Sequence, residues 1–289
     1  MPSRTLLTDN HMNLIIQATQ PIAAMHLDRL AKLAQSRQRE QIAAHAFRLA
    51  GARVHPEIAP YCLANRLDYG FVAHDLKLED FGLVVMDMDS TLITIECIDE
   101  IADMQGLKPQ VSKITEAAMR GEIDFAESLR RRVALLEGLD EHALQRVYDE
   151  RLQLSPGAEI MLEALRSRGI RTLLVSGGFA FFTDRLKTRL GLDYTQANTL
   201  EIANGKLTGK VRGKVFDAQG KADSLVKIRD ELNLGPGQVI AMGDGANDLK
   251  MMAQAGISIA YHAKPVVREQ ASYALNFVGL DGLVNLLAQ

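Results

Sequence analysis

The sequence has no tryptophan, few aromatic residues and only two cysteines, Cys62 and Cys97. Two cysteines cannot form a disulfide framework, and neither lies in a CxxC or Cys/His spacing typical of zinc. No apolar run approaches the roughly 18 residues of a membrane-spanning helix, and the N-terminus lacks the apolar core of a signal peptide. We therefore expect a cytoplasmic protein without membrane association.

An excess of charge of one sign is also missing, because 33 Lys and Arg face 36 Asp and Glu. This balance gives no electrostatic footprint for nucleic acid or anionic lipid. The motifs GxxxxGK[ST] and GxGxxG do not occur, which removes the usual means of ATP hydrolysis and NAD chemistry. We expect a small-molecule partner that is recognised locally.

Short β-branched apolar runs alternate with amphipathic stretches from Leu83 onward, which predicts an α/β fold with a doubly wound parallel sheet. The predicted strands lie at 83–86, 170–175, 238–242 and 256–260. Asn204-Gly205 lies between two alternating segments, a strong hairpin signal. We expect this hairpin to form an antiparallel ribbon at the edge of the sheet.

The segment between the first two predicted strands is too long for a simple crossover. Helical spacing predicts helices over 109–119, 124–136 and 140–152, the second with Asp124 as N-cap and Glu127 three residues later. We therefore predict a helical cap inserted at about 97–153 in a domain that spans 81–289. Ser155 and Pro156 predict the N-cap and first turn of the next helix, which runs through Arg168.

Residues 1–80 differ in character and predict a small α+β domain. An apolar run at 14–16 is followed by a stretch rich in Ala, Arg and Gln from Ile22 to Ala50, which predicts a helix. The domain would join the rest of the chain through 77–80.

Polar turns follow the first three predicted strands, at 87–91, 176–178 and 243–248. Taken alone, each is compatible with an ordinary loop or tight turn. Ligands of open α/β sheets bind beyond the carboxyl ends of the strands, where these turns should meet. Ser176 and the glycines after it can offer a hydroxyl and free N–H groups to an anion, and Asp244 between two glycines can face a cation.

Lys221 opens the helix before the third strand, where its charge opposes the positive end of the helix dipole. A bound anion would explain this placement. A solvated lysine is the ordinary alternative.

The motifs DxDxT at 87–91, Ser-Gly at 176–177, Lys221 and GDGxND at 243–248 occur in the order of the four signature motifs of the haloacid dehalogenase (HAD) superfamily. The chain is similar to this superfamily of aspartate-nucleophile phosphotransferases, and its segments 96–101, 118–121, 124–125 and 128–133 closely resemble the phosphoserine phosphatase family. Residues 1–80 loosely resemble the degenerate ACT-like regulatory or interaction domains that precede this enzyme in many bacteria.

The resemblance implies a Rossmann-like HAD core and a chemical role for each matching residue. Asp87 would be the nucleophile that forms an aspartyl-phosphate, and Asp89 would protonate the leaving group and then activate water. Mg²⁺ would be held by Asp87, the backbone carbonyl of Asp89, and Asp244. The phosphate would be bound by Ser176, Gly177, Lys221 and Asn247.

The resemblance also implies the substrate, O-phosphoserine, in the last step of serine biosynthesis. Glu96 would bind its ammonium group and Arg132 its carboxylate, while Met119 and Phe125 would form an apolar wall. The sequence leaves open that Glu96 is a helix N-terminal charge, that 130–132 is a solvated helix face, and that the two apolar residues are cap core. It also leaves open whether the protein is a homodimer.

Two other functions stay open. The phosphoryl group could pass to an alcohol such as homoserine instead of water. The chain could also be a non-catalytic phospho-acceptor regulator, since receiver domains combine a doubly wound sheet, Mg²⁺, an acidic pair and a lysine. A cap of this size and an acid at Asp89 argue against the regulator.

Overall fold

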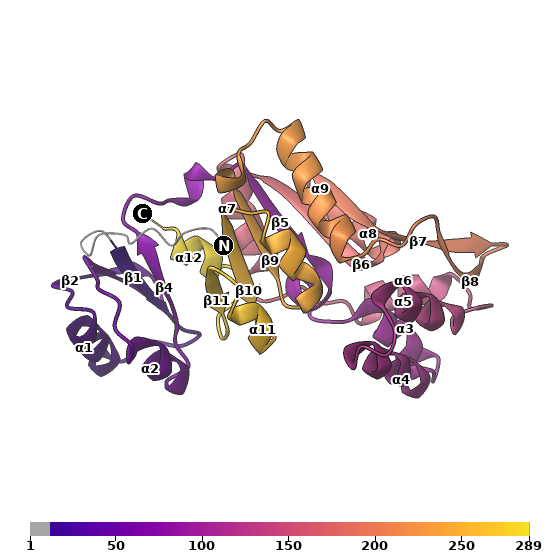
Figure 1. Cartoon of the computed structure of the whole chain (residues 1–289), viewed down its shortest axis with the longest axis horizontal. Coiled ribbons are helices and arrows are strands. Elements are labelled where there is room, and N and C mark those ends of the chain that lie inside the picture. Colours follow the sequence, from indigo (N-terminus) through magenta and orange to yellow (C-terminus); the bar gives the residue numbers. More distant parts are fainter. Residues whose placement is uncertain (1–11, 289) are drawn as a thin grey trace.

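A computed structural model describes residues 12–288 and contains two β-sheets (Figure 1). The larger sheet has seven strands in the order β11-β10-β9-β5-β6-β7-β8. Its pairs are parallel except for β7 with β8. The strands are β5 (Leu83–Asp87), β6 (Arg171–Phe179), β7 (Tyr194–Ala203), β8 (Lys206–Arg212), β9 (Val239–Gly243), β10 (Ile257–Tyr261) and β11 (Tyr273–Leu275).

Helices cover both faces of this sheet, which confirms the doubly wound fold. Successive residues of β5 point to opposite faces, so Val84 and Met86 belong to one buried cluster while Leu83 and Val85 belong to the other. The helices of the core are α7 (Ala158–Ser167), α8 (Ala180–Leu190), α9 (Ala218–Glu231), α10 (Leu249–Met252), α11 (Pro265–Arg268) and α12 (Gly282–Leu286), with short turns η3 (Pro236–Gln238) and η4 (Ala246–Asp248). Within 12–288, no helix has the length and apolarity needed to cross a membrane.

The predicted hairpin is confirmed at the edge of the sheet. Asn204 and Gly205 both have positive φ, 51° and 74°, as a two-residue hairpin turn requires. β7 pairs with β6 only as far as Asn198, and from Thr199 onward it pairs with β8. The hairpin therefore projects beyond the core (Figure 1).

The inserted cap is helical, as predicted, and consists of α3 (Cys97–Met104), α4 (Lys108–Met119), α5 (Phe125–Ala134) and α6 (His142–Glu150). The Asp124 side chain accepts a hydrogen bond from the Glu127 N–H at 2.7 Å, the predicted N-cap of α5. The cap is entered through η2 (Met88–Leu92), and its two connections pair with each other at Ile93 and Leu154.

The cap also rests on the β7–β8 hairpin. The Gly138 N–H donates to the Leu207 carbonyl, and the Leu207 N–H donates to the Leu139 carbonyl, both at 2.8 Å. The Glu141 N–H donates to the Gly205 carbonyl at 3.0 Å. The cap is thus attached to the core through the hairpin as well as through its two connections.

The predicted start of α7 is wrong. The N-cap is Gly157, with φ 75°, where a Cβ atom would collide with Asp281. Ser155 is instead part of the cap connection, because its N–H donates to the Leu92 carbonyl at 3.0 Å.

The N-terminal part forms an antiparallel sheet in the order β2-β3-β1-β4. The predicted helix over Ile22–Ala50 is correct only as far as Leu33. Gln35 has a left-handed backbone (φ 54°), and the chain beyond it forms two strands. The predictions for residues 1–11 lie outside the described residues. The elements are β1 (Met12–Gln17), α1 (Ala24–Leu33), β2 (Gln38–Ala43), β3 (Ala46–Ala50), α2 (Ile58–Ala64), β4 (Asp68–Ala73) and the turn η1 (Leu78–Asp80).

This small sheet is anchored to the core by the buried carboxylate of Asp68. It accepts hydrogen bonds from the backbone N–H groups of Asn276, Phe277 and Val278 at 2.7, 2.8 and 2.9 Å. In Figure 1 the small sheet and the cap lie at opposite ends of the molecule.

Candidate active site

A cavity of about 560 Å³ lies between the cap and the carboxyl ends of β5, β6 and β9. The polar turns after these strands meet there, as expected for turns at the carboxyl ends of parallel strands. The predicted site residues that line it are Asp87, Asp89, Glu96, Phe125, Arg132, Gly177, Lys221, Asp244 and Asn247.

Asp87 ends β5 and is 4% exposed. Its Oδ1 accepts hydrogen bonds from the Met88 N–H at 2.8 Å and lies 2.6 Å from the Lys221 ammonium. Burial and the nearby charge of Asp248 raise the pKa of Asp87 well above its ordinary value, although Lys221 opposes this. A nearby positive charge is therefore needed to keep Asp87 ionised.

Lys221 is 1% exposed and lies between two carboxylates. Its Nζ is 2.6 Å from Asp87 Oδ1 and 2.7 Å from Asp248 Oδ1. Burial alone would lower the pKa of Lys221, but Asp248 and Asp87 together raise it above its ordinary value. The negative charges that explain the position of Lys221 in the first turn of α9 thus include two carboxylates of the protein itself.

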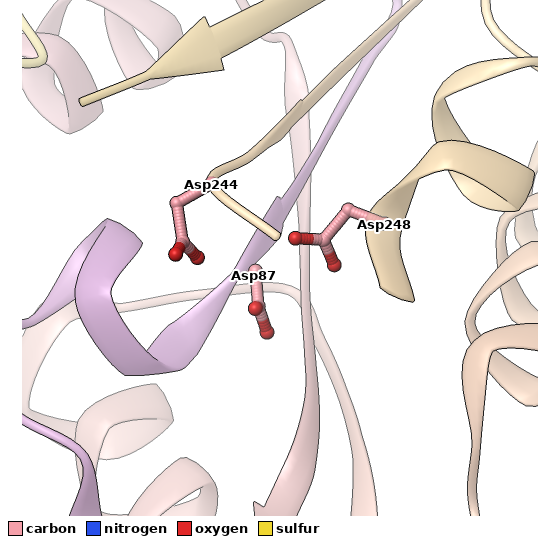
Figure 2. A group of neighbouring side chains, drawn as sticks. All are labelled: Asp87, Asp244 and Asp248. Carbon is pink, nitrogen blue, oxygen red and sulfur yellow. The ribbon is translucent and has the colours of Figure 1, made fainter. Parts of the chain in front are cut away.

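Asp244 follows β9, and its carboxylate lies beside those of Asp87 and Asp248 (Figure 2). One carboxylate oxygen from each of the three lies within 4.8 Å of the other two. Burial, and then the charge of Asp248, raises the pKa of Asp244 to about 6. Three crowded carboxylates with one ammonium among them fit a hard divalent cation with oxygen ligands, such as Mg²⁺.

Asp89 is turned into the same cavity by a reversal of the chain at Ser90, whose φ is 55°. Its Oδ1 accepts from the Cys97 N–H at 2.8 Å, and its Oδ2 accepts from the Ser176 hydroxyl at 2.9 Å. Both oxygens are therefore fixed in orientation. Ser176 is fully buried and does not line the cavity, and its Oγ also accepts from the Gly178 N–H.

Glu96 precedes α3 and lines the cavity beside the turn that follows β5. Its Oε1 accepts from the Ser90 hydroxyl at 2.6 Å. Part of its side chain reaches solvent, yet removal from bulk water and the charge of Asp89 raise the pKa of Glu96 to about 7. A cationic group in the cavity would stabilise its ionised form.

Arg132 is the one of the three consecutive arginines of α5 that lines the cavity, whereas Arg130 and Arg131 are exposed. Arg131 pairs with Glu127 on the surface, at 2.7 Å. Burial lowers the pKa of Arg132, and the acidic groups facing it, first Asp99, oppose this shift. The guanidinium is still the charged form at neutral pH.

Phe125 begins α5 and touches the core at Gly177. A Cβ atom at Gly177 would lie 2.9 Å from the tip of the Phe125 ring, so a larger residue there would displace this ring. Met119 is the last residue of α4, and its side chain lies outside the described part of the structure. Asn247 lies in η4 at the rim of the acidic cluster.

Sequence reasoning missed three charged residues of the site. Asp248 ends the GDGxND motif and is fully buried against Lys221. Asp99 lines the cavity one helical turn after Glu96. Lys264 lines the cavity just after β10. The turn after the fourth predicted strand lies at the same edge of the sheet as the other three, so it could have been predicted to contribute a residue.

A family model described as haloacid dehalogenase-like hydrolase matches residues 81–256, and a model described as a domain of unknown function matches 14–58. The chain belongs to the haloacid dehalogenase-like hydrolases. In this chain, the family fold consists of a mainly parallel sheet with an acidic cluster at its carboxyl edge and an inserted cap.

Within this class, the chain belongs to the phosphoserine phosphatase family. It is 52% identical to the phosphoserine phosphatase of Polaromonas sp. over 80% of this chain and 98% of that protein. A crystal structure of a probable phosphoserine phosphatase from Vibrio cholerae has a TM-score of 0.85 and 38% identity, covering 96% of this chain and 86% of that one. A phospho-aspartyl intermediate analogue of phosphoserine phosphatase has a TM-score of 0.67 and 39% identity, covering 72% of this chain and 99% of that one.

Proposed function

We propose that the chain hydrolyses O-phosphoserine to serine and phosphate through an aspartyl-phosphate on Asp87, as the last step of serine biosynthesis. The observation that carries the proposal is the convergence of Asp87, Lys221 and Asp244 beneath a cap that contributes Arg132 and Glu96 to the same cavity. The related phospho-aspartyl analogue supports the intermediate.

The carboxylates of Asp87 and Asp244, with the backbone carbonyl of Asp89, would hold Mg²⁺, and Asp248 lies close enough to take part. When bound, Mg²⁺ neutralises negative charge at the phosphoryl group. Two unit charges about 4 Å apart at an effective dielectric of 20 repel by roughly 4 kcal/mol, so a carboxylate and a phosphate need such compensation.

Asp87 attacks phosphorus in this proposal, forming a P–O bond as the bond to the seryl oxygen breaks. Lys221, held in place by Asp248, offers its ammonium to the phosphate oxygens, and Asn247 and the Gly177 turn orient them. Ser176 would act on the phosphate only if its hydroxyl leaves Asp89.

Asp89 donates a proton to the departing seryl oxygen and then accepts one from the water that hydrolyses the aspartyl-phosphate. Its two hydrogen bonds, from Cys97 and Ser176, fix the carboxyl group in the turn that follows Asp87. One residue therefore serves both half-reactions.

The test is a phosphate-release screen over phosphoserine, phosphothreonine, sugar phosphates and pyridoxal phosphate, with Mg²⁺ and after EDTA. We expect phosphoserine to be preferred, activity to vanish in EDTA, and Mg²⁺ to restore it. A second arm adds homoserine and measures phosphorylated acceptor, which separates hydrolysis from transfer. Preference for another phosphomonoester, or full activity after exhaustive chelation, would overturn the proposal.

Replacing Arg132 with Ala should weaken phosphoserine selectively. A charge-assisted pair with the substrate carboxylate contributes about 1.5 to 3 kcal/mol, which corresponds to roughly 10- to 150-fold in kcat/KM. p-Nitrophenyl phosphate has no carboxylate, so its hydrolysis should change little. Arg131→Ala, on the exposed face of the same helix, is the matched control. Equal losses on both substrates would mean that Arg132 supports the cap and not the carboxylate.

The KM for phosphoserine should fall as the pH rises through about 7, because Glu96, whose pKa is raised to about 7, then gains the charge that pairs with the substrate ammonium. Glu96→Gln should remove this dependence. The KM for p-nitrophenyl phosphate over the same pH range corrects for ionisation of the phosphate itself. An unchanged profile in the Gln variant would assign the titration to another group.

We further propose that residues 1–80 are an accessory ACT-like regulatory or interaction domain and that catalysis belongs to 81–289, with the cap at about 97–153. In support, none of the residues that line the cavity comes from 12–80. Phosphate release by a chain shortened to 81–289 would test the division.

A further inference from the structure

Asn198 is a buried polar side chain that joins two segments, each of which carries a residue of the cavity. It is 2% exposed and is the last residue of β7 to pair with β6. Its Nδ2 donates to the Gly177 carbonyl at 2.9 Å and to the Phe216 carbonyl at 3.1 Å. Its Oδ1 accepts from the Phe216 N–H at 2.7 Å. Every polar atom of the amide is therefore used.

The first segment held by this amide is the turn at the end of β6. Pairing between β6 and β7 is irregular between Ser176 and Phe179, and there the Gly177 carbonyl accepts from the Asn198 side chain. Gly177 lines the cavity and touches Phe125 of the cap. The amide thus fixes the turn proposed to hold the phosphate.

The second segment leads into α9. Both backbone polar groups of Phe216 are bound to Asn198, and the next residue, Asp217, caps α9 by accepting from the N–H groups of Gln219 and Gly220 at 3.0 Å. Lys221 follows in the first turn and reaches Asp87. The position of the ammonium thus depends on the segment that Asn198 holds.

We propose that Asn198 is a positioning residue of the active site, whose amide fixes the Gly177 turn and the start of the Lys221 helix relative to each other. The inference rests on the proposed phosphatase function. An aliphatic side chain would fill the volume but leave polar groups of Gly177 and Phe216 unpaired. A shift of about 1 Å in groups that position a substrate can cost about 100-fold in rate.

Asn198→Leu tests the inference, since leucine has a similar size and no hydrogen bonds. Asn198→Asp is the second variant, because it keeps the acceptor for the Phe216 N–H, loses the two bonds from Nδ2 and sets a carboxylate oxygen against the two carbonyls. The matched control is Thr172→Val at the far end of β6. Thr172 is 5% exposed, and its hydroxyl donates to Asp193 Oδ2 and accepts from the Asp193 N–H, both at 3.1 Å. Control and test each lose buried hydrogen bonds, but those of Thr172 do not reach the cavity.

The measurements are kcat/KM on phosphoserine and on p-nitrophenyl phosphate, inhibition by orthovanadate with Mg²⁺ present, and Tm. We expect the Asn198 variants to lose about 10- to 100-fold in kcat/KM on both substrates, as for other residues that orient catalytic groups. Orthovanadate inhibition should weaken in parallel. The Thr172→Val control should lower Tm and keep kcat/KM within about twofold of the wild type, since its hydrogen bonds lie away from the site.

An Asn198 variant that is folded, with wild-type kcat/KM and wild-type inhibition by orthovanadate, would overturn the inference. Loss on phosphoserine alone would also overturn it, because the Gly177 turn and Lys221 serve any phosphomonoester. If the wild type hydrolyses neither substrate, the proposed function fails instead, and calorimetric binding of orthovanadate to the variants still tests the positioning role.

Discussion

Asp87→Asn should abolish phosphate release while the protein stays folded. The amide has the shape of the carboxylate and can still accept from the Met88 N–H and from Lys221, but it is not a nucleophile. Loss of a covalent nucleophile lowers kcat by at least about a thousandfold, as triad knockouts in other hydrolases show. Folding is retained because one buried negative charge is removed while Lys221 keeps Asp248 as a partner.

Two quantities are measured on the same preparation: phosphate release from phosphoserine, and Tm as a check of folding. Asp149→Asn, on the exposed face of α6, makes the same chemical change away from the cavity and should behave as the wild type. Asp89→Asn gives a further comparison, since loss of a general acid costs about 10²- to 10⁴-fold and should slow both half-reactions. Appreciable turnover by a clean Asp87→Asn preparation would exclude Asp87 as the nucleophile.

Lys221→Met should lower both activity and stability. It leaves the carboxylates of Asp87 and Asp248 buried together without a cation, and breaking a buried ion pair in this way costs about 3 to 5 kcal/mol. Activity should fall as well, because no ammonium remains to meet the phosphate oxygens. The loss of stability follows from the burial of this lysine, which is 1% exposed.

The measurements for Lys221→Met are denaturant unfolding at several pH values and kcat on phosphoserine. The deficit in unfolding free energy should narrow as the pH is lowered. Asp87 has a raised pKa in the folded state, so protonation favours the folded form at low pH, and that contribution is lost as the pH rises through the folded pKa. Lys227→Met, on the same helix and 70% exposed beside Glu231, should change stability by less than about 1 kcal/mol. A Lys221 variant as stable as this control would show that the buried pair does not support the fold.

Strong local patterns predicted the sheet, the cap helices and the hairpin. The run at 83–86 is apolar throughout because both faces of β5 are covered, and Asn204-Gly205 suits one turn type. The helix predicted from Ile22 to Ala50 was wrong in its second half. The composition of this stretch favours a helix, but Phe47 and Leu49 pair with β1 and make that half part of a sheet. Tertiary pairing overrides propensity there.

The motifs also predicted which turns meet, but not how their side chains pair. Lys221 was interpreted through the helix dipole and, by resemblance, as a phosphate ligand, whereas its two carboxylate partners lie far from it in the sequence, in β5 and η4. Ser176 was expected to face a ligand, yet its hydroxyl donates to Asp89. The role of Asn198 could not be predicted from the sequence. Its three hydrogen bonds go to backbone groups, which are present whatever the partner residue type.

The contact between cap and hairpin has a mechanical consequence for access to the cavity. A cap that swung on its two connections alone would break the backbone hydrogen bonds that join Gly138, Leu139 and Glu141 to the hairpin. Keeping these bonds requires the hairpin to travel with the cap, and β7 is released from β6 beginning at Thr199, directly after Asn198. A cap movement that keeps these bonds would therefore have to bend β7 at the point where its pairing with β6 ends.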